Sequence, residues 1–208
     1  MEFLKRFISS IILILIVFFF IIKGSVFFNF FLFLIFCISC YEWYKMSQSI
    51  KYFLIGNFFL IFSFFTVYSI KTSNSSDSIF IFIISVCIST DIGGYIFGNI
   101  FKGPKLTKIS PKKTYAGMIG GYFLSIIFIL LYFNFLNHEV TVVWFITTIL
   151  ISSVSQMGDI IISYFKRLSK LKNTGNIIPG HGGILDRIDG MIFAFPIYYL
   201  IELSGYLI

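Results

Sequence analysis

The sequence predicts an all-α fold, a polytopic membrane bundle of about seven transmembrane helices, from its composition and its long apolar runs. Of the 208 residues, 58% are hydrophobic and only 12% are charged, and the mean hydropathy is +0.94. A soluble domain is nearer half apolar and a quarter charged, so it could not bury this much apolar surface. Several runs also approach the roughly 20 apolar residues that a helix needs to cross a bilayer.

The first apolar segment, residues 7–22, follows Lys5 and Arg6 much as the core of a secretory signal would. A cleavable signal has a shorter core and small residues at the cut, whereas this segment leads directly into a second one at 25–41. We therefore expect a retained anchor helix. Cys37 and Cys40 form a CxxC pair inside the second segment, without the βαβ context of a redox motif, and we interpret them as helix-packing residues.

Five further segments follow, each separated from the next by a polar or basic stretch. The polar turn from Ser73 to Ser78 divides the third segment from the fourth, and basic linkers at 101–114 and 164–189 precede the fifth and the seventh. These five segments cover residues 52–70, 79–100, 115–136, 141–163 and 190–207.

The basic residues predict how the chain is oriented. Loop 101–114 carries five lysines and loop 164–189 carries five basic residues, whereas the alternate loops carry few. Lysine-rich loops stay on the cytoplasmic side of a membrane. Seven crossings then place the N-terminus and both loops in the cytoplasm, so we expect a protein of the cell inner (cytoplasmic) membrane with its functional site facing the cytoplasm.

The nine acidic residues divide into two sets by position. Five stand near segment ends, where we expect solvated side chains: Glu2, Glu42, Asp77, Glu139 and Glu202. Of the others, Asp91 lies within the fourth segment and Asp159 in the last turns of the sixth. Ionisable groups at such depth usually face a cavity, a partner or an ion. A buried salt bridge to lysine or arginine is the structural alternative for both.

The deep carboxylates have polar neighbours at helical spacing. On a helix, Asp159, Ser163 and Lys166 share one face. Asp186 and Asp189 stand one turn apart where the chain re-enters the membrane; helix capping is the alternative for this pair, although it explains one aspartate better than two. Carboxylates in such an arrangement suit Mg²⁺, which binds a few carboxylates, waters and substrate phosphates.

Glycines and cations complete a pattern that is typical of phosphate binding. Gly180, Gly182 and Gly183 would let backbone N–H groups approach an anion, and His181 would either donate to a phosphate or cap a turn. Loop 101–114 adds a polar cluster, for which contact with lipid headgroups is the alternative: Ser110, Lys112, Lys113 and Thr114. Together these groups predict phosphoryl or nucleotidyl transfer, but they do not identify the substrate.

The same residues resemble the signature of the phosphatidate cytidylyltransferase (CDP-diacylglycerol synthase) family. The resemblance covers roughly residues 85 to 200, with Asn173 and Ala116 standing where the family usually has carboxylates. Further elements that match are Gly158 with Asp159, the stretch Ser110–Thr114, and Asp91 with Tyr95. The matching positions of the main signature are Ser163, Lys166, Arg167, Lys172, Gly175, Pro179, His181, Gly182, Gly183, Asp186, Arg187 and Asp189.

The resemblance implies an enzyme that transfers the cytidylyl group of CTP to phosphatidate, forming CDP-diacylglycerol and pyrophosphate. It implies Mg²⁺ as the cofactor, a second, monovalent cation as a further expectation, phosphatidate drawn from the bilayer, a homodimer, and no nucleic acid. We then expect residues 1–78 to be a scaffold of transmembrane helices. Residues 79–208 would be the catalytic transmembrane region, with cytoplasmic loops 101–114 and 164–189.

Roles are assigned residue by residue from the resemblance. Asp159 and Asp186 are expected to hold the metal ion or its waters, with Asp91 as a further candidate. Asp189 would join them or orient Arg187. The expected catalytic residues are Asp159, Lys166, Arg167, Asp186, Arg187 and Asp189. The expected substrate-binding residues are Ser110, Lys112, Lys113, Thr114, Ser163, Lys172, His181, Gly182 and Gly183.

Two other functions fit the composition less well. The CDP-alcohol phosphatidyltransferases have an Asp-Gly-x-x-Ala-Arg core that this chain lacks. A cation-coupled membrane transporter could also use buried carboxylates. Transporters, however, tend to show repeated halves and helices broken near mid-membrane, whereas the polar residues here cluster towards one face.

Overall fold

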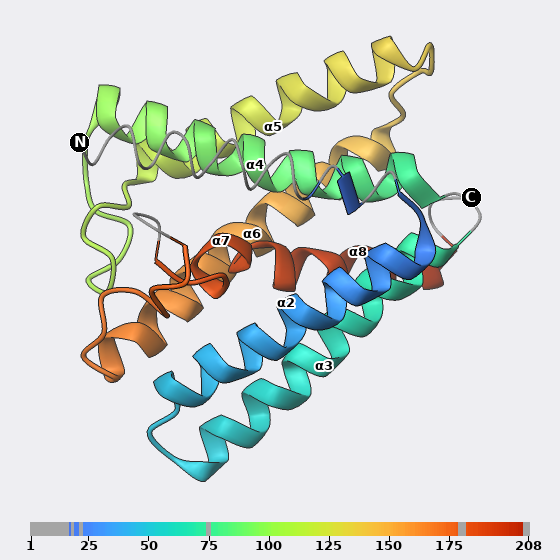
Figure 1. The fold of residues 1–208 in the computed structure, drawn as a ribbon. Coiled ribbons are helices and arrows are strands. Elements are labelled where there is room, and N and C mark those ends of the chain that lie inside the picture. Colours follow the sequence, from blue (N-terminus) through green and yellow to red (C-terminus); the bar gives the residue numbers. More distant parts are fainter. Residues whose placement is uncertain (1–16, 18, 21–22, 74–75, 179–181, 206–208) are drawn as a thin grey trace. The chain divides into compact units, whose positions relative to one another are not determined.

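In the computed structural model, the described residues are 17, 19–20, 23–73, 76–178 and 182–205, and they form helices without a β-strand (Figure 1). The elements along the chain are α2 (Ser25–Met46), α3 (Ile50–Thr72), α4 (Ser76–Phe101), α5 (Tyr115–Phe135), α6 (Val142–Leu168), α7 (Leu185–Ile188) and α8 (Met191–Leu203). The prediction of an all-α fold is confirmed.

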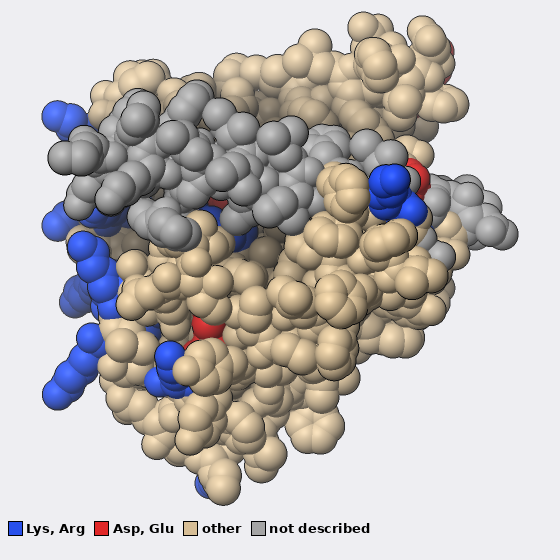
Figure 2. All heavy atoms as spheres, in the orientation of Figure 1, with Lys and Arg blue, Asp and Glu red and all other residues tan. Residues whose placement is uncertain are grey.

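Five of these helices, α2 to α6, are long and apolar enough to cross a membrane. They correspond to the second to sixth predicted segments, and their apolar residues remain exposed: Phe58 is 71% exposed and Phe135 is 82% exposed. Figure 2 likewise shows a face on which the described side chains are mostly uncharged. Lipid is the solvent that suits such a surface. The chain is an integral membrane protein.

The two ends of the predicted bundle differ from the central helices. The segment predicted at 7–22 lies outside the described residues apart from 17, 19 and 20. The last segment is helical, but α8 ends at Leu203 and has only 13 residues. At 1.5 Å per residue it is about 20 Å long, short of the ~30 Å hydrocarbon core. The separate single turn α7 precedes it.

The chain divides by its contacts into two compact units. The first comprises Met1–Tyr68 and Phe165–Ile188, and the second comprises Ser69–Tyr164 and Asp189–Ile208. These units are defined by contacts in space and not by position along the chain. They therefore leave the expected division after residue 78 untested.

In the first unit, α2 and α3 form an antiparallel hairpin that holds the segment beginning at Phe165 (Figure 1). The indole N–H of Trp43 donates to the carbonyl oxygen of Tyr52 at 3.1 Å. The ring of Phe165 lies 4.8 Å from that of Trp43 and 5.5 Å from that of Tyr52. The hydroxyl of Ser169 donates to the carbonyl oxygen of Met46. The hairpin therefore anchors the start of the long loop that follows α6.

In the second unit, α4 and α5 lie side by side, with glycines at their contact (Figure 1). A Cβ atom on Gly93 would lie 2.9 Å from the carbonyl carbon of Gly120, and one on Gly117 would lie 2.7 Å from the carbonyl oxygen of Gly94. Small residues let membrane helices approach closely where no hydrophobic effect drives them together. This packing fixes the ends of loop 102–114, which connects the two helices.

Glycines also bring α6 against the start of α8 in the second unit. A Cβ on Gly158 would lie 2.6 Å from the carbonyl oxygen of Asp189, and one on Gly190 would lie 3.3 Å from Cβ of Ser155. The backbone of Asp189 is consequently packed beside the helical turn that carries Asp159. Two predicted site residues, 30 positions apart in the sequence, thus come from adjoining segments of one unit.

Candidate active site

The predicted site residues fall into the two units, each described separately below. His181 lies outside the described residues. The second unit contains Asp91, Ser110, Lys112, Lys113, Thr114, Asp159, Ser163 and Asp189. The first unit contains Lys166, Arg167, Lys172, Gly182, Gly183, Asp186 and Arg187.

Asp159 is the centre of the polar cluster in the second unit. Its Oδ2 forms an ion pair with Nζ of Lys113, and the side chains of Lys113 and Asp159 are 22% and 34% exposed. The hydroxyl of Ser163, one turn later on α6, lies 3.4 Å from Oδ1. The predicted shared face of Asp159 and Ser163 is confirmed. The salt bridge considered as the alternative is also present, on a carboxylate that solvent still reaches.

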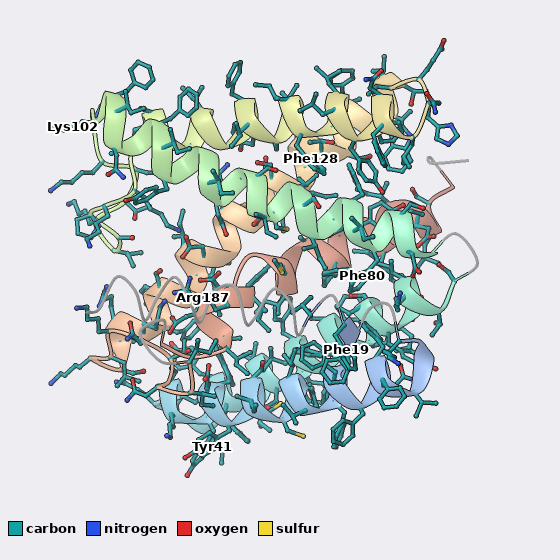
Figure 3. All side chains as sticks on the ribbon, turned by 45° about the horizontal axis from the view of Figure 1, so that its top comes forward. Phe19, Tyr41, Phe80, Lys102, Phe128 and Arg187 are labelled. Atoms are coloured by element: carbon teal, nitrogen blue, oxygen red, sulfur yellow. The ribbon has the colours of Figure 1, made fainter. Side chains whose placement is uncertain are left out.

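Backbone hydrogen bonds and a helix cap order loop 102–114, which carries the lysines. The chain leaves α4 at Lys102, labelled in Figure 3, which has a φ of 51°. The N–H of Leu106 donates to the carbonyl oxygen of Lys113 at 2.8 Å, so the two ends of the loop pair with each other. Thr114 caps α5, because its hydroxyl accepts the N–H of Gly117 at 3.1 Å. Lys112 is exposed at the end of this loop.

Asp91 and Asp189 belong to the same unit but have different surroundings. Asp91 is exposed on α4. Asp189 is half-buried between α7 and α8, where its Oδ1 accepts the N–H of Gly190 at 3.0 Å. Both carboxylates lie within electrostatic range of the buried thiol of Cys87. Within the described part of the chain, however, no three His, Cys, Asp or Glu side chains are grouped closely enough to hold a metal ion by themselves.

Both carboxylate oxygens of Asp186 accept hydrogen bonds. Its Oδ1 accepts from Nζ of Lys166 at 2.7 Å, and both side chains are nearly buried, at 8% and 11% exposure. Its Oδ2 accepts the N–H groups of Thr174 at 2.8 Å and Gly183 at 3.1 Å. Burial raises the pKa of Asp186, but the bonds from Lys166, Gly183 and Thr174 outweigh burial and lower the pKa below its usual value. This carboxylate is therefore ionised at neutral pH.

Backbone hydrogen bonds pair Ile178 with Gly182 on either side of the central residues of the glycine-rich stretch. The N–H of Ile178 donates to the carbonyl oxygen of Gly182 at 2.9 Å, and the reverse bond measures 3.2 Å. Gly182 has a φ of 90°, which side chains other than glycine rarely adopt, and a Cβ there would lie 2.7 Å from Oδ2 of Asp186. Glycine at 182 thus lets the backbone at this position approach Asp186 closely.

A further carboxylate, which the sequence did not mark as a site residue, holds Thr174, Ile184 and Leu185. Glu42, expected to be solvated at the end of α2, is 1% exposed. It accepts the hydroxyl of Thr174 at 2.7 Å and the N–H groups of Ile184 and Leu185 at 3.0 and 2.9 Å. The expectation was wrong because position near a segment end does not reveal a later part of the chain that covers it. The sequence feature that could have indicated burial is a single acidic residue between two aromatic residues, Tyr41 and Trp43, at the end of an apolar run.

The other predicted cations of the first unit, Arg167, Lys172 and Arg187, are exposed. Arg167 donates to the carbonyl oxygen of Leu171 at 3.2 Å. Lys172 lies on the following loop, and Arg187, labelled in Figure 3, projects from α7. With Lys166 they supply positive charge around the glycine-rich loop, which suits polyanionic substrates.

The donor chemistry around Asp159 fits a hydrated magnesium ion. Its carboxylate is hard, partly exposed and shared with one ammonium and one hydroxyl, so ligand sites remain on both oxygens. The carboxylate of Asp186 has fewer acceptor positions left for a metal ion. Its Oδ2 already accepts two N–H groups, and its Oδ1 accepts one ammonium. Oδ1 retains one acceptor position for an ion or its water.

A multi-pass membrane protein with an ionised carboxylate at Asp186, lysines paired with carboxylates and a glycine-rich stretch beside Asp186 belongs to the class of membrane enzymes that act on phosphates. Comparison with known proteins defines the class further. A sequence model of the cytidylyltransferase family matches residues 48–204. This chain belongs to that family.

Curated relatives carry a more specific name. The chain is 34% identical over 171 residues to the phosphatidate cytidylyltransferase of Rickettsia typhi, an alignment that covers 78% of this chain and 75% of the relative. It is 35% identical over 170 residues to that of Rickettsia bellii, covering 77% and 74%. It is 43% identical over 119 residues to that of Staphylococcus aureus, covering 56% and 45%. The suspected family resemblance is confirmed.

Proposed function

We infer that this chain transfers the cytidylyl group of CTP to phosphatidate, forming CDP-diacylglycerol and pyrophosphate for phospholipid synthesis. The observation that carries this inference is the family match over residues 48–204, together with relatives named for this activity. The matched region contains every site residue that the sequence predicted, whereas Glu42 lies before it. Family membership does not support the cation-coupled transporter that the sequence left as an alternative.

The reaction requires two polyanions to be brought together. A phosphate oxygen of phosphatidate attacks the α-phosphorus of CTP, a bond forms between them, and the bond to the oxygen that bridges to the β-phosphorus breaks. Pyrophosphate leaves. Because the attacking phosphate is already anionic near neutral pH, no strong general base is needed. The protein's task is positioning and charge neutralisation.

The described cations are suited to this task. Lys113 and Lys166 each hold a carboxylate, and each ammonium has three N–H groups, so both can also donate to a phosphate. We propose that the glycine-rich loop, with Lys172 and Arg187 exposed nearby along the chain, receives the triphosphate from water. Ser110, Lys112, Ser163 and Arg167 are proposed to assist in binding. The hydroxyl of Thr114 orders the lysine loop through its cap on α5.

We propose Mg²⁺ as the cofactor, with Asp159 and Asp186 each as a candidate ligand, Asp189 as support for Asp159, and Asp91 and a second, monovalent cation as further proposals. When bound, the metal would supply positive charge to the triphosphate. Asp159 offers it a partly exposed carboxylate. Lys113 and Lys166 keep the two carboxylates oriented, as outer partners of metal ligands do.

The direct test is incorporation of radiolabelled CTP into lipid by the purified protein in detergent micelles containing phosphatidate. We expect labelled CDP-diacylglycerol to form with Mg²⁺ and to disappear on chelation. Micelles with diacylglycerol in place of phosphatidate are the control, because they lack the attacking phosphate. Failure of the full-length protein to label phosphatidate at any Mg²⁺ concentration would overturn the proposed function.

We further propose that the site faces the cytoplasm in the inner membrane, and labelling of single cysteines tests this. Lys112 and His138 are both exposed and lie at opposite ends of α5. In intact cells, an impermeant maleimide is expected to label His138→Cys and to miss Lys112→Cys, which should react only after permeabilisation. The unmodified chain controls for its own three cysteines. Labelling of Lys112→Cys from outside would contradict the orientation.

Asp189→Asn is expected to reduce turnover by about 10–100-fold and to raise the Mg²⁺ concentration needed, as loss of an outer metal partner does. The reason is that Asp189 lies beside the Asp159 turn while its own Oδ1 is engaged by Gly190. The measurement is a Mg²⁺ titration of turnover. An unchanged Mg²⁺ requirement would limit Asp189 to capping the backbone at Gly190.

A further inference from the structure

Glu42 has a set of contacts that the proposed chemistry does not use. Its Oε2 accepts both the hydroxyl of Thr174 and the N–H of Leu185, and its Oε1 accepts the N–H of Ile184. The backbone of Gly175 also lies directly against Glu42, because a Cβ on Gly175 would stand 2.5 Å from Oε1. A buried carboxylate with three donors is rigid, since each donor loses a strong acceptor if the group moves.

The contacts of Glu42 interlock with those of Asp186 through one residue. Thr174 donates its hydroxyl to Glu42 and its backbone N–H to Asp186. At the far end of the loop, Gly183 donates to Asp186, and the next two N–H groups donate to Glu42. The two carboxylates therefore hold both ends of the segment from Thr174 to Gly183. Lys166 is attached to the same network through Asp186.

Glu42 comes from a part of the chain that the family match does not include. The match covers residues 48–204, whereas Glu42 lies in the last turns of α2. The N-terminal helices were expected to be scaffold only. Within the first unit, however, α2 contacts α7, and Glu42 is its buried charged residue at that place.

We propose that Glu42 is a positioning residue of the cytidylyl-transfer site, which holds Thr174 and the backbone of Gly183–Leu185 in the conformation that receives the triphosphate of CTP. This inference rests on the proposed function and adds to it a residue outside the catalytic signature. Glu42 acts through Thr174 and the backbone, without contact with the reacting atoms.

Glutamine at position 42 cannot replace the glutamate, although it has the same size. An amide has one oxygen and one NH₂ group, and the NH₂ group can only donate. With NH₂ in the place of Oε2 it faces the N–H of Leu185, and with NH₂ in the place of Oε1 it faces the N–H of Ile184. Either orientation leaves a backbone N–H without an acceptor, so the loop must shift.

The test compares CTP and phosphatidate kinetics for matched variants of the full-length protein in detergent. Glu42→Gln and Thr174→Val are expected to raise KM for CTP by about 10–100-fold, the usual effect of losing support behind a site. KM for phosphatidate should change by less than about threefold, a free-energy difference close to RT. Thr174→Ser keeps the hydroxyl and is expected to restore KM for CTP to near the wild-type value.

Thr66→Val is the control for a purely structural loss. Thr66 is a buried hydroxyl in the same unit, and it donates to the carbonyl oxygen of Ser63 at 2.7 Å. This variant is expected to lower the unfolding temperature without changing KM for CTP. The rise in unfolding temperature on adding CTP alone provides a binding measurement that does not depend on turnover.

The outcomes separate this inference from the proposed function. An active wild-type protein whose Thr174→Val variant keeps its KM for CTP, or whose Thr174→Ser variant fails to restore it, would overturn the role of Glu42 alone. The comparison of Thr174→Val with Thr174→Ser tests the role of Glu42 even where Glu42→Gln does not fold. A wild-type protein without CTP turnover would overturn the proposed function, and the positioning role with it.

Discussion

Asp159→Asn is expected to abolish CTP incorporation while leaving the folded protein nearly as stable as the wild type. Turnover should fall by more than about 10³-fold, the upper range for losing one charge-stabilising group in an active site. The free energy of unfolding should change by less than about 1 kcal/mol. The reason is that the Lys113–Asp159 pair is partly exposed and screened by solvent. The measurements are a Mg²⁺ titration of turnover and thermal unfolding in detergent.

Asp77→Asn is the matched control for this experiment. Asp77 also pairs with a lysine, Lys71, but its side chain is 64% exposed and lies at the start of α4. This substitution removes the same charge from a surface ion pair and is expected to keep full turnover. If Asp159→Asn retains near wild-type turnover at ordinary Mg²⁺, Asp159 serves only as the ion-pair partner of Lys113, and the proposed mechanism has the wrong centre.

Asp186→Asn is expected to abolish turnover and also to destabilise the protein, in contrast to Asp159→Asn. If the amide oxygen keeps the N–H groups of Thr174 and Gly183, the NH₂ group faces the ammonium of Lys166. Breaking a buried ion pair on one side costs roughly 3–5 kcal/mol, because the remaining charge stays buried. Thermal unfolding and Mg²⁺-dependent turnover, measured on the same preparations, check both parts.

Lys166→Met combined with Asp186→Asn separates the two effects. Removing the ammonium as well should recover much of the lost stability, since no uncompensated charge remains, but turnover should stay abolished. Recovery of turnover in the double variant would contradict a role for Asp186 and Lys166 in the chemistry and leave them as a structural pair.

Most of the fold could be predicted from periodicity and composition alone. The helices from α2 to α6 lie where the apolar segments were drawn, because a chain crossing lipid must satisfy its backbone within each helix. The prediction was less accurate at the end of the chain. The apolar run after residue 190 suggested a full span, but α8 ends at Leu203. Apolar length gives no information on where a helix containing Pro196 stops.

The sequence predicted the types of residue in the candidate site but not which lysine pairs with which carboxylate. Asp159 and Asp186 were recognised from their depth and their spacing, whereas their partners Lys113 and Lys166 were two of many available lysines. The first pair joins the loop after α4 to α6, and the second joins the end of α6 to α7. These contacts bring distant segments together, and a local pattern does not record them.

The sequence by itself determined a helical membrane protein, its family and the chemical types in its site, because bilayer solvation and the signature motif act on residues that are close along the chain. Only the tertiary structure decided the burial of Glu42. A carboxylate near a helix end is solvated unless another segment covers it, and here Thr174, Ile184 and Leu185 do so. Burial depends on what packs against a residue from elsewhere in the chain. The sequence around Glu42 could not reveal this, since its partners lie 132 to 143 positions away.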